Sequence, residues 1–471
     1  MNTAPNEGSL ADQLGLDRVT RFQVLILTLG VFVLFCDGFD AQMMSFVAPA
    51  LARDLALRST DLGPVFAMNL AGLTVGAALL APFADGVSRK FMIILCVTLF
   101  GLSTLLVPLL VPFFPPVPAL LILRFVTGMC MGAAMPMMIA MASEFVPWRL
   151  KARLLVVLSC AFSAGATLCS AVSGPIIQTF GWKTLFWIGG LLPFAAAFMI
   201  FVFLPESPRY LALRNKTDQL IRLAAKLAPG TAFNANAQER PATAKRRLFP
   251  VKELFTEGRA FLTLLIWATF FCYGASLYFL VNWLPTLVTK AGFSISQATA
   301  ATTMYHVGGL VGGFLISFLV DRSGLRALVT STFAACFAIA LMSFTTGSLA
   351  TIFVAAFIVG VLVIGNQHTV NVLTGSTFYP NAVRATGLGW ALASVRLGGV
   401  LAGSLGAGLL LNSGLPIASI FVIIALGELC AGISLATLYL MQRGSAVSAS
   451  SCGSGTRAMP ELIRKRSLES H

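Results

Sequence analysis

Long apolar runs alternate with short polar connections along almost the whole chain. Because a helix needs roughly 20 apolar residues to cross a bilayer, each run of that length predicts one membrane-spanning helix. The predicted spans are residues 22–49, 62–83, 91–112, 117–143, 154–178, 184–204, 260–288, 298–320, 327–346, 349–372, 385–410 and 416–441. The pattern therefore predicts an all-α membrane protein with twelve transmembrane helices, six before a long polar insert and six after it.

Composition agrees with a membrane protein and narrows its chemistry. Charged residues make up 11% of the chain, against about a quarter in soluble domains. Eight of the nine cysteines fall inside predicted spans, so neither a disulfide framework nor a zinc-type spacing is indicated. We find no nucleophile and base set and no phosphate-binding loop, and we expect no enzyme activity and no cofactor.

The Lys and Arg residues behind the net charge of +14 lie mainly in the connections between the predicted spans rather than in one basic patch. If the N-terminus lies inside, the outer connections hold only Arg53, Arg58, Lys183 and Lys290. An excess of Lys and Arg on one side marks the cytoplasmic side, so both termini are expected in the cytoplasm. This topology suits the inner membrane of a bacterium and gives no reason to expect a nucleic acid partner.

The polar insert divides the chain into two halves. We expect a cytoplasmic segment at 1–21, a six-helix bundle at 22–204, a basic cytoplasmic linker at 205–259, a second bundle at 260–441 and a disordered cytoplasmic tail at 442–471. The connection after the second span carries Asp85 and Arg89, and the connection after the eighth carries Asp321 and Arg322. Such an internal repeat is typical of transporters built from two related bundles.

Two carboxylates stand three residues apart inside the first span, at Asp37 and Asp40. A charged residue at the bilayer centre costs about 2.5–3.5 kcal/mol on insertion scales, so an acid there is first considered functional. Residues i and i+3 share a helix face, which lets both acids point into one protein-lined space. Proton coupling by at least one of them is our hypothesis, and a structural pair with a membrane arginine is the alternative.

Arg124 and Arg396 are the two basic residues that fall inside predicted spans. A guanidinium group pairs with a carboxylate through two parallel hydrogen bonds, so Arg396, near the centre of its span, is a candidate for binding an acid substrate. A permanent ion pair with an Asp of the first span is the alternative. Arg124 lies nearer a helix end and is a second candidate, with relay or packing as alternatives.

Other polar and aromatic residues in the spans are candidates for substrate contact. Gln367 and Asn371 stand four residues apart on one helix face, although neighbouring helices often satisfy such groups. Trp283, Tyr305 and His306 offer rings and polar atoms for an aromatic ligand. Aromatic residues in apolar helices more often serve packing, and His306 is as easily a core histidine with a hydrogen-bond partner.

Several motifs resemble those of a known family. They are the turns at Asp85 and Asp321, the pattern Arg124-x-x-x-Gly128-x-x-x-Gly132-x-x-x-Pro136 and the turn Pro205-Glu206-Ser207-Pro208-Arg209. These resemble the major facilitator superfamily, although Ala81, Gly86 and Ser88 replace the family's Gly, Arg and Gly in the first turn. The resemblance implies two pseudo-symmetric six-helix bundles. It also implies a gate at their cytoplasmic ends, formed by Asp85, Arg89, Glu144, Asp321 and Arg322, with simple surface ion pairs as the alternative.

Within that superfamily the chain looks most like the aromatic acid:proton symporters, through Asp37-Gly38-Phe39-Asp40 and Ser143-Glu144-Phe145-Val146-Pro147. The resemblance implies uptake of an aromatic carboxylate, such as a hydroxybenzoate or a phenylpropionate, together with protons by alternating access. The expected partners are the acid, protons and the lipid bilayer, with the proton gradient in place of a cofactor and a monomer as the oligomeric state. A proton-driven exporter of lipophilic compounds and a membrane sensor of aromatic acids are the alternatives.

Overall fold

The computed structural model describes residues 20–83, 87–146, 151–227, 251–256, 259–344, 348–374, 378–379 and 384–451, and only the backbone at 82, 151–157, 159–160, 384–385, 442 and 444–451. Within these ranges the regular structure is entirely helical. The first half contains α2 (Arg21–Asp54), α3 (Ser59–Val75) continued by η1 (Gly76–Leu80) and α4 (Ala81–Phe83), α5 (Arg89–Leu110), α6 (Pro116–Phe145), α7 (Lys151–Phe180) and α8 (Trp182–Phe203).

The second half repeats this arrangement after three short linker elements. These are α9 (Pro208–Leu213), α10 (Thr217–Leu227) and the 3₁₀ helix η4 (Val251–Phe255). The long helices that follow are α11 (Ala260–Lys290), α12 (Ile295–Ser323), α13 (Leu325–Met342), α14 (Leu349–Leu373), α15 (Arg384–Gly398) continued by η6 (Gly399–Gly406) and α16 (Ala407–Asn412), and α17 (Ile417–Ser451).

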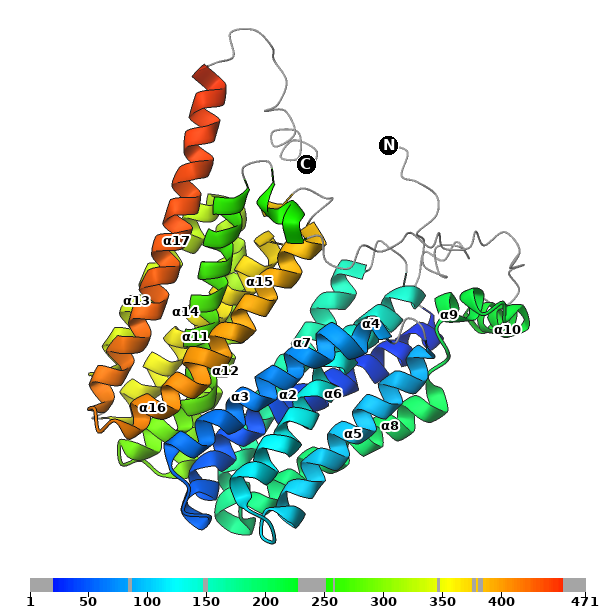
Figure 1. Cartoon of the computed structure of the whole chain (residues 1–471), viewed down its shortest axis with the longest axis horizontal. Coiled ribbons are helices and arrows are strands. Elements are labelled where there is room, and N and C mark those ends of the chain that lie inside the picture. Colours follow the sequence, from blue (N-terminus) through cyan, green and yellow to red (C-terminus); the bar gives the residue numbers. More distant parts are fainter. Residues whose placement is uncertain are drawn as a thin grey trace.

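The prediction of a helical membrane protein is confirmed. Among the described residues, 11 helices are long and apolar enough to cross a membrane. α7, several of whose side chains are not described, occupies the place of the remaining predicted span at 154–178. The long helices of each half form one bundle, and the two bundles stand side by side (Figure 1).

The last helix is longer than the predicted span at 416–441. α17 continues to Ser451, past the expected start of the tail at residue 442, and the rest of the tail lies outside the described residues. No proline occurs between 442 and 451, so the backbone hydrogen-bonding pattern of the last span is not broken there. In the linker, α10 is amphipathic, and its buried side chains pack with the apolar core of the first bundle.

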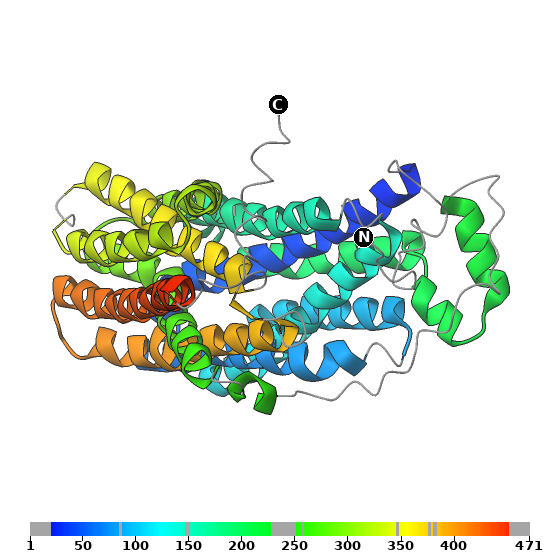
Figure 2. The same cartoon turned by 90° about the horizontal axis from the view of Figure 1, so that it is seen from above.

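The bundles approach each other at one end and diverge toward the other (Figure 1, with a second view in Figure 2). At the lower edge of Figure 1 the start of α3 meets η6 and α16, where a side chain on Gly63 would press on the Ser404 carbonyl. On the same interface the Phe66 ring packs edge-to-face on Trp283, with ring centroids 5.2 Å apart. The start of α2, with α9 and α10, lies at the opposite, divergent end (Figure 1).

Candidate functional site

Close helix packing sets the direction in which the two acids of α2 point. α2 and α7 touch backbone to backbone, because a side chain on Gly38 would overlap the carbonyl of Phe162 and one on Gly165 would overlap that of Phe35. Small residues of this kind allow membrane helices to approach closely. Since Gly38 must face α7, the rotation of α2 is fixed, and with it the directions in which Asp37 and Asp40 point.

Asp40 is held inside the first bundle. Its side chain is 1% exposed, and its Oδ2 accepts a hydrogen bond from Arg124 Nη1 at 3.1 Å, while the Thr104 hydroxyl donates to Oδ1 at 3.2 Å. The Arg124 guanidinium also lies over the Phe186 ring, 5.1 Å from its centroid. Four helices, α2, α5, α6 and α8, thus meet at one buried ion pair.

Asp37 is different because it has no such partner. It is 6% exposed, its Oδ1 has no hydrogen-bond partner, and it forms no ion pair with any residue that the structure describes. The positive charge that acts on it is Arg396 of α15, in the other bundle, and the Tyr278 hydroxyl of α11 lies in the field of both. An acid and a base from different bundles therefore act on each other without forming an ion pair among the described residues.

Arg396 is placed by a tight contact between α11 and α15. Side chains on Gly274 and Gly398 would overlap the backbones of Val395 and Phe271, respectively, so the helices meet directly beside Arg396. The π-helical segment η6 begins three residues later, and Gly399 at its start packs on the Tyr278 ring. Wide helical turns of this type are frequent at functional sites.

The remaining predicted substrate residues are not joined to this acid and base pair by any hydrogen bond among the described residues. Gln367 donates to Asn371 of the same helix at 2.9 Å, and its Oε1 has no partner. Trp283 is fully buried and donates its indole N–H to the Gly403 carbonyl at 3.2 Å. Trp283 therefore serves the contact between the bundles in this arrangement.

Tyr305 and His306 lie in the interior of the second bundle. Their rings pack edge-to-face with centroids 5.5 Å apart, and neither the Tyr305 hydroxyl nor His306 Nε2 has a hydrogen-bond partner. Glu428 of α17 is the acid whose charge acts on the Tyr305 hydroxyl. We did not single out Glu428 from the sequence, although a lone acid in the apolar run 416–441 is the same signal that marked Asp37 and Asp40.

The predicted gate residues form contacts inside each bundle. Arg89 is ion-paired with Glu144, and the Ser207 hydroxyl donates to Glu144 Oε2 at 2.5 Å, which ties the turn before α9 to α6. In the second bundle, Asp321 and Arg322 are exposed at the end of α12, where Arg322 lies over the Phe318 ring at 4.3 Å. Asp85 lies outside the described residues.

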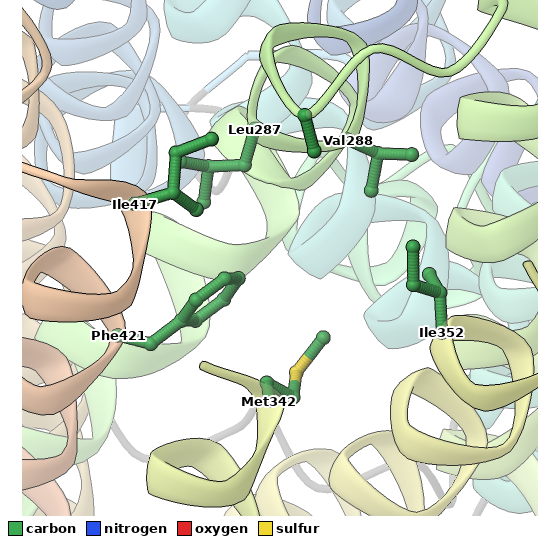
Figure 3. Close-up of a pocket in the computed structure, with 7 residues that line it drawn as sticks. Leu287, Val288, Met342, Ile352, Ile417 and Phe421 are labelled. Carbon is green, nitrogen blue, oxygen red and sulfur yellow. The ribbon is translucent and has the colours of Figure 1, made fainter. Parts of the chain in front are cut away.

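A small apolar pocket lies apart from these polar groups (Figure 3). Leu287, Val288, Met342, Ile352 and Phe421 contribute to its lining, between α11, α13, α14 and α17. It offers no donor or cation to an anionic ligand. In the part of the chain that the structure describes, no group of three or more His, Cys, Asp or Glu residues is placed to hold a metal ion. The Asp37 and Arg396 pair is therefore the candidate site.

A model of the Major Facilitator Superfamily matches residues 30–402. The chain belongs to this superfamily. It is similar to the 4-hydroxybenzoate transporter PcaK of Pseudomonas aeruginosa, with 35% identity over 83% of the chain and 87% of the relative. It is also similar to the gallate transporter of Pseudomonas putida, with 32% identity over 88% of the chain and 92% of the relative.

A solved structure has the same fold. A structure of the xylose transporter XylE from E. coli in a partially occluded, inward-open conformation superposes with a TM-score of 0.68 at 18% identity, covering 88% of this chain and 97% of that one. This superfamily member is therefore a multi-pass membrane transporter rather than an enzyme. Members of the superfamily are generally driven by ion gradients and need no cofactor.

Proposed function

We propose that this transporter brings an aromatic carboxylate into the cytoplasm together with protons, by alternating access. The observation that carries the proposal is the placement of Asp37 and Arg396 on opposite sides of the bundle interface. The two relatives described above are transporters of 4-hydroxybenzoate and gallate, and both of these compounds combine an aromatic ring with a carboxylate.

Arg396 is our candidate for the substrate's carboxylate. Its planar guanidinium can form two parallel hydrogen bonds to a carboxylate, and no ion pair with a described residue occupies it. Tyr278 stands beside it and offers an aromatic face and a hydroxyl to a ring. Arg124, in contrast, is engaged with Asp40, so its expected role is to hold the first bundle together. Gln367, Asn371, Trp283, Tyr305 and His306 remain candidates for contacts in other states of the cycle.

Asp37 is our candidate for the coupled proton. While Asp37 is ionised, its charge competes with the substrate's carboxylate for Arg396. Protonation removes that competitor and lets the acid bind, and proton loss on the cytoplasmic side restores the competition and favours release. Proton and substrate are thus loaded and unloaded together, which is the requirement for symport. Asp40 would keep its charge throughout, because Arg124 neutralises it at hydrogen-bonding distance.

The gate follows from the end at which the bundles meet. With both termini in the cytoplasm, the divergent end, which includes the start of α2 and α9, faces the cytoplasm. The contacts of Gly63 and Phe66 close the outer end. Rocking of the bundles would open that end and bring the turn near Asp321 and Arg322 toward Arg89 and Glu144. Binding sites at the interface of two rocking bundles are typical of secondary transporters.

Counterflow in proteoliposomes tests the proposal. Labelled 4-hydroxybenzoate, a phenylpropionate and an unrelated aliphatic acid are offered with and without an imposed inward proton gradient. We expect uptake of the aromatic acids that is accelerated by the gradient. Efflux of lipophilic dyes without acid uptake would replace the proposal with an exporter, and acid binding without flux would replace it with a sensor.

A further inference from the structure

Glu428 is an acid in the middle of the second bundle that the proposed cycle does not use. It lies in α17, its side chain is 0% exposed, and neither of its carboxyl oxygens has a hydrogen-bond partner of standard geometry. Ser276 of α11 is its neighbouring hydroxyl, and the Ser276 oxygen is also without a partner. Intramembrane acids are costly and are placed where function requires them.

The groups facing Glu428 are neutral. α11 contributes Ser276, Cys272 and Tyr273, α12 contributes Tyr305, and α13 contributes Cys336. No Lys, Arg or His of the described residues acts on its charge. A carboxylate buried without a cation and without a hydrogen bond of standard geometry is far less stable than the neutral acid, which favours a protonated carboxyl group here.

α11 connects Glu428 to the candidate site. Ser276, which faces Glu428, and Tyr278, on whose hydroxyl both Asp37 and Arg396 act, are two residues apart on this helix. Two residues correspond to a rotation of roughly 200° around an α-helix, so the two side chains point to nearly opposite sides. α11 packs on α17, where Gly427 lies against Ser276, and on α15, where Gly274 lies against Val395. A shift of α11 therefore changes both surroundings at once.

We propose that Glu428 is a second proton site of this transporter, which exchanges its proton with water when α11 moves during the transport cycle. The step is a proton transfer alone: the carboxyl O–H bond breaks, the proton passes to water, and the carboxylate remains until it is protonated again. The Ser276 and Tyr305 hydroxyls, both without partners here, would then donate to the carboxylate. The role in transport rests on the proposed symport, whereas the proton exchange itself does not.

Infrared difference spectroscopy of the full-length protein in liposomes tests the exchange without any substrate. We expect a protonated-carboxyl C=O band that decreases as the pH is raised and is missing in Glu428→Gln, a variant of nearly the same shape. Ser276→Ala is the matched control, because it keeps the acid and should shift the band without removing it. A wild-type spectrum without a titrating band of this kind, or the same band in Glu428→Gln, would refute the proposal. Asp37 can give a titrating band of its own, so the same spectra are recorded for Asp37→Asn, in which the Glu428 band should remain. If Glu428→Gln does not fold, the loss of every titrating band in Asp37→Asn refutes the proposal instead.

The number of protons moved per substrate tests the role in transport. The pH gradient that just balances a known gradient of 4-hydroxybenzoate is measured in wild-type and Glu428→Gln proteoliposomes. We expect the ratio to fall by one proton per substrate, with counterflow retained. An unchanged ratio in a variant that still transports would reject the coupling role. If wild-type protein takes up no acid, the proposed function fails instead, and the infrared titration still decides the proton site.

Discussion

At the scale of single residues, the two acids of α2 differ in their partners although they share a helix. Arg396 of the other bundle acts on Asp37 without forming an ion pair among the described residues, and Asp40 is bound to Arg124. Asp37→Asn keeps the shape of the side chain but cannot exchange a proton. We therefore expect it to abolish gradient-driven accumulation while counterflow continues, because Arg396 stays free for the acid. The measurement is the accumulation ratio in vesicles, and a ratio equal to that of wild type contradicts the assignment.

Asp40→Asn should act on stability rather than on coupling. It leaves Arg124 buried, at 1% exposure, without a counter-ion, and breaking a buried pair costs about 3–5 kcal/mol. Asp40→Asn combined with Arg124→Gln removes both charges and should recover much of that loss. Thermal unfolding of the single and double variants in detergent measures the difference. Strictly additive losses would show that the two residues are not energetically coupled.

The sequence predicted that these residues matter but not which of them pair. Hydropathy and spacing locate an acid or base in a span, whereas pairing depends on the rotation of each helix about its axis. Here Gly38 sets that rotation through its contact with α7, a long-range effect that the local pattern does not contain. Glu428 was missed for a different reason. It stands alone, without the second acid that drew attention to Asp37 and Asp40.

At the scale of elements, Gly38 itself can be tested. A methyl group there overlaps the Phe162 backbone, so Gly38→Ala must push α2 and α7 apart. Overpacking of this kind costs about 1–3 kcal/mol, and the displaced Asp37 should also weaken proton coupling. Gly389→Ala in α15 is the control, because a methyl group there meets nothing within 4 Å. Melting temperature and accumulation ratio should fall together in the first variant only. Equal behaviour of the two variants would show that the contact does not position the acid.

The lengths of the helices were largely predictable, and their ends and irregular turns were not. The first span was expected at 22–49 and α2 covers Arg21–Asp54, because apolar length determines where a helix can cross the bilayer. The same criterion does not register where a helix continues past its apolar run, as α17 does beyond residue 441 to Ser451. Nor does it detect the π-helical segment η6, whose wide turns follow Arg396 and depend on packing against α11.

At the scale of the whole molecule, the contact of α3 with η6 and α16 is our candidate for the outer gate. A side chain on Gly63 would press on the Ser404 carbonyl, so Gly63→Leu should keep the outer ends apart and shift the population toward an outward-open arrangement. Spin labels at the exposed positions Arg58 and Ser413, in a background with the native cysteines replaced, report the separation of these ends.

We expect a longer mean distance between the labels in Gly63→Leu and a loss of net uptake, while acid binding from the outside is retained. Gly389→Ala again serves as the control and should leave the distance distribution unchanged. If the distance in Gly63→Leu equals that of wild type although uptake is lost, the contact is not the outer gate. In that case the closure must depend on other contacts of the interface, of which the edge-to-face packing of Phe66 on Trp283 is the next to test.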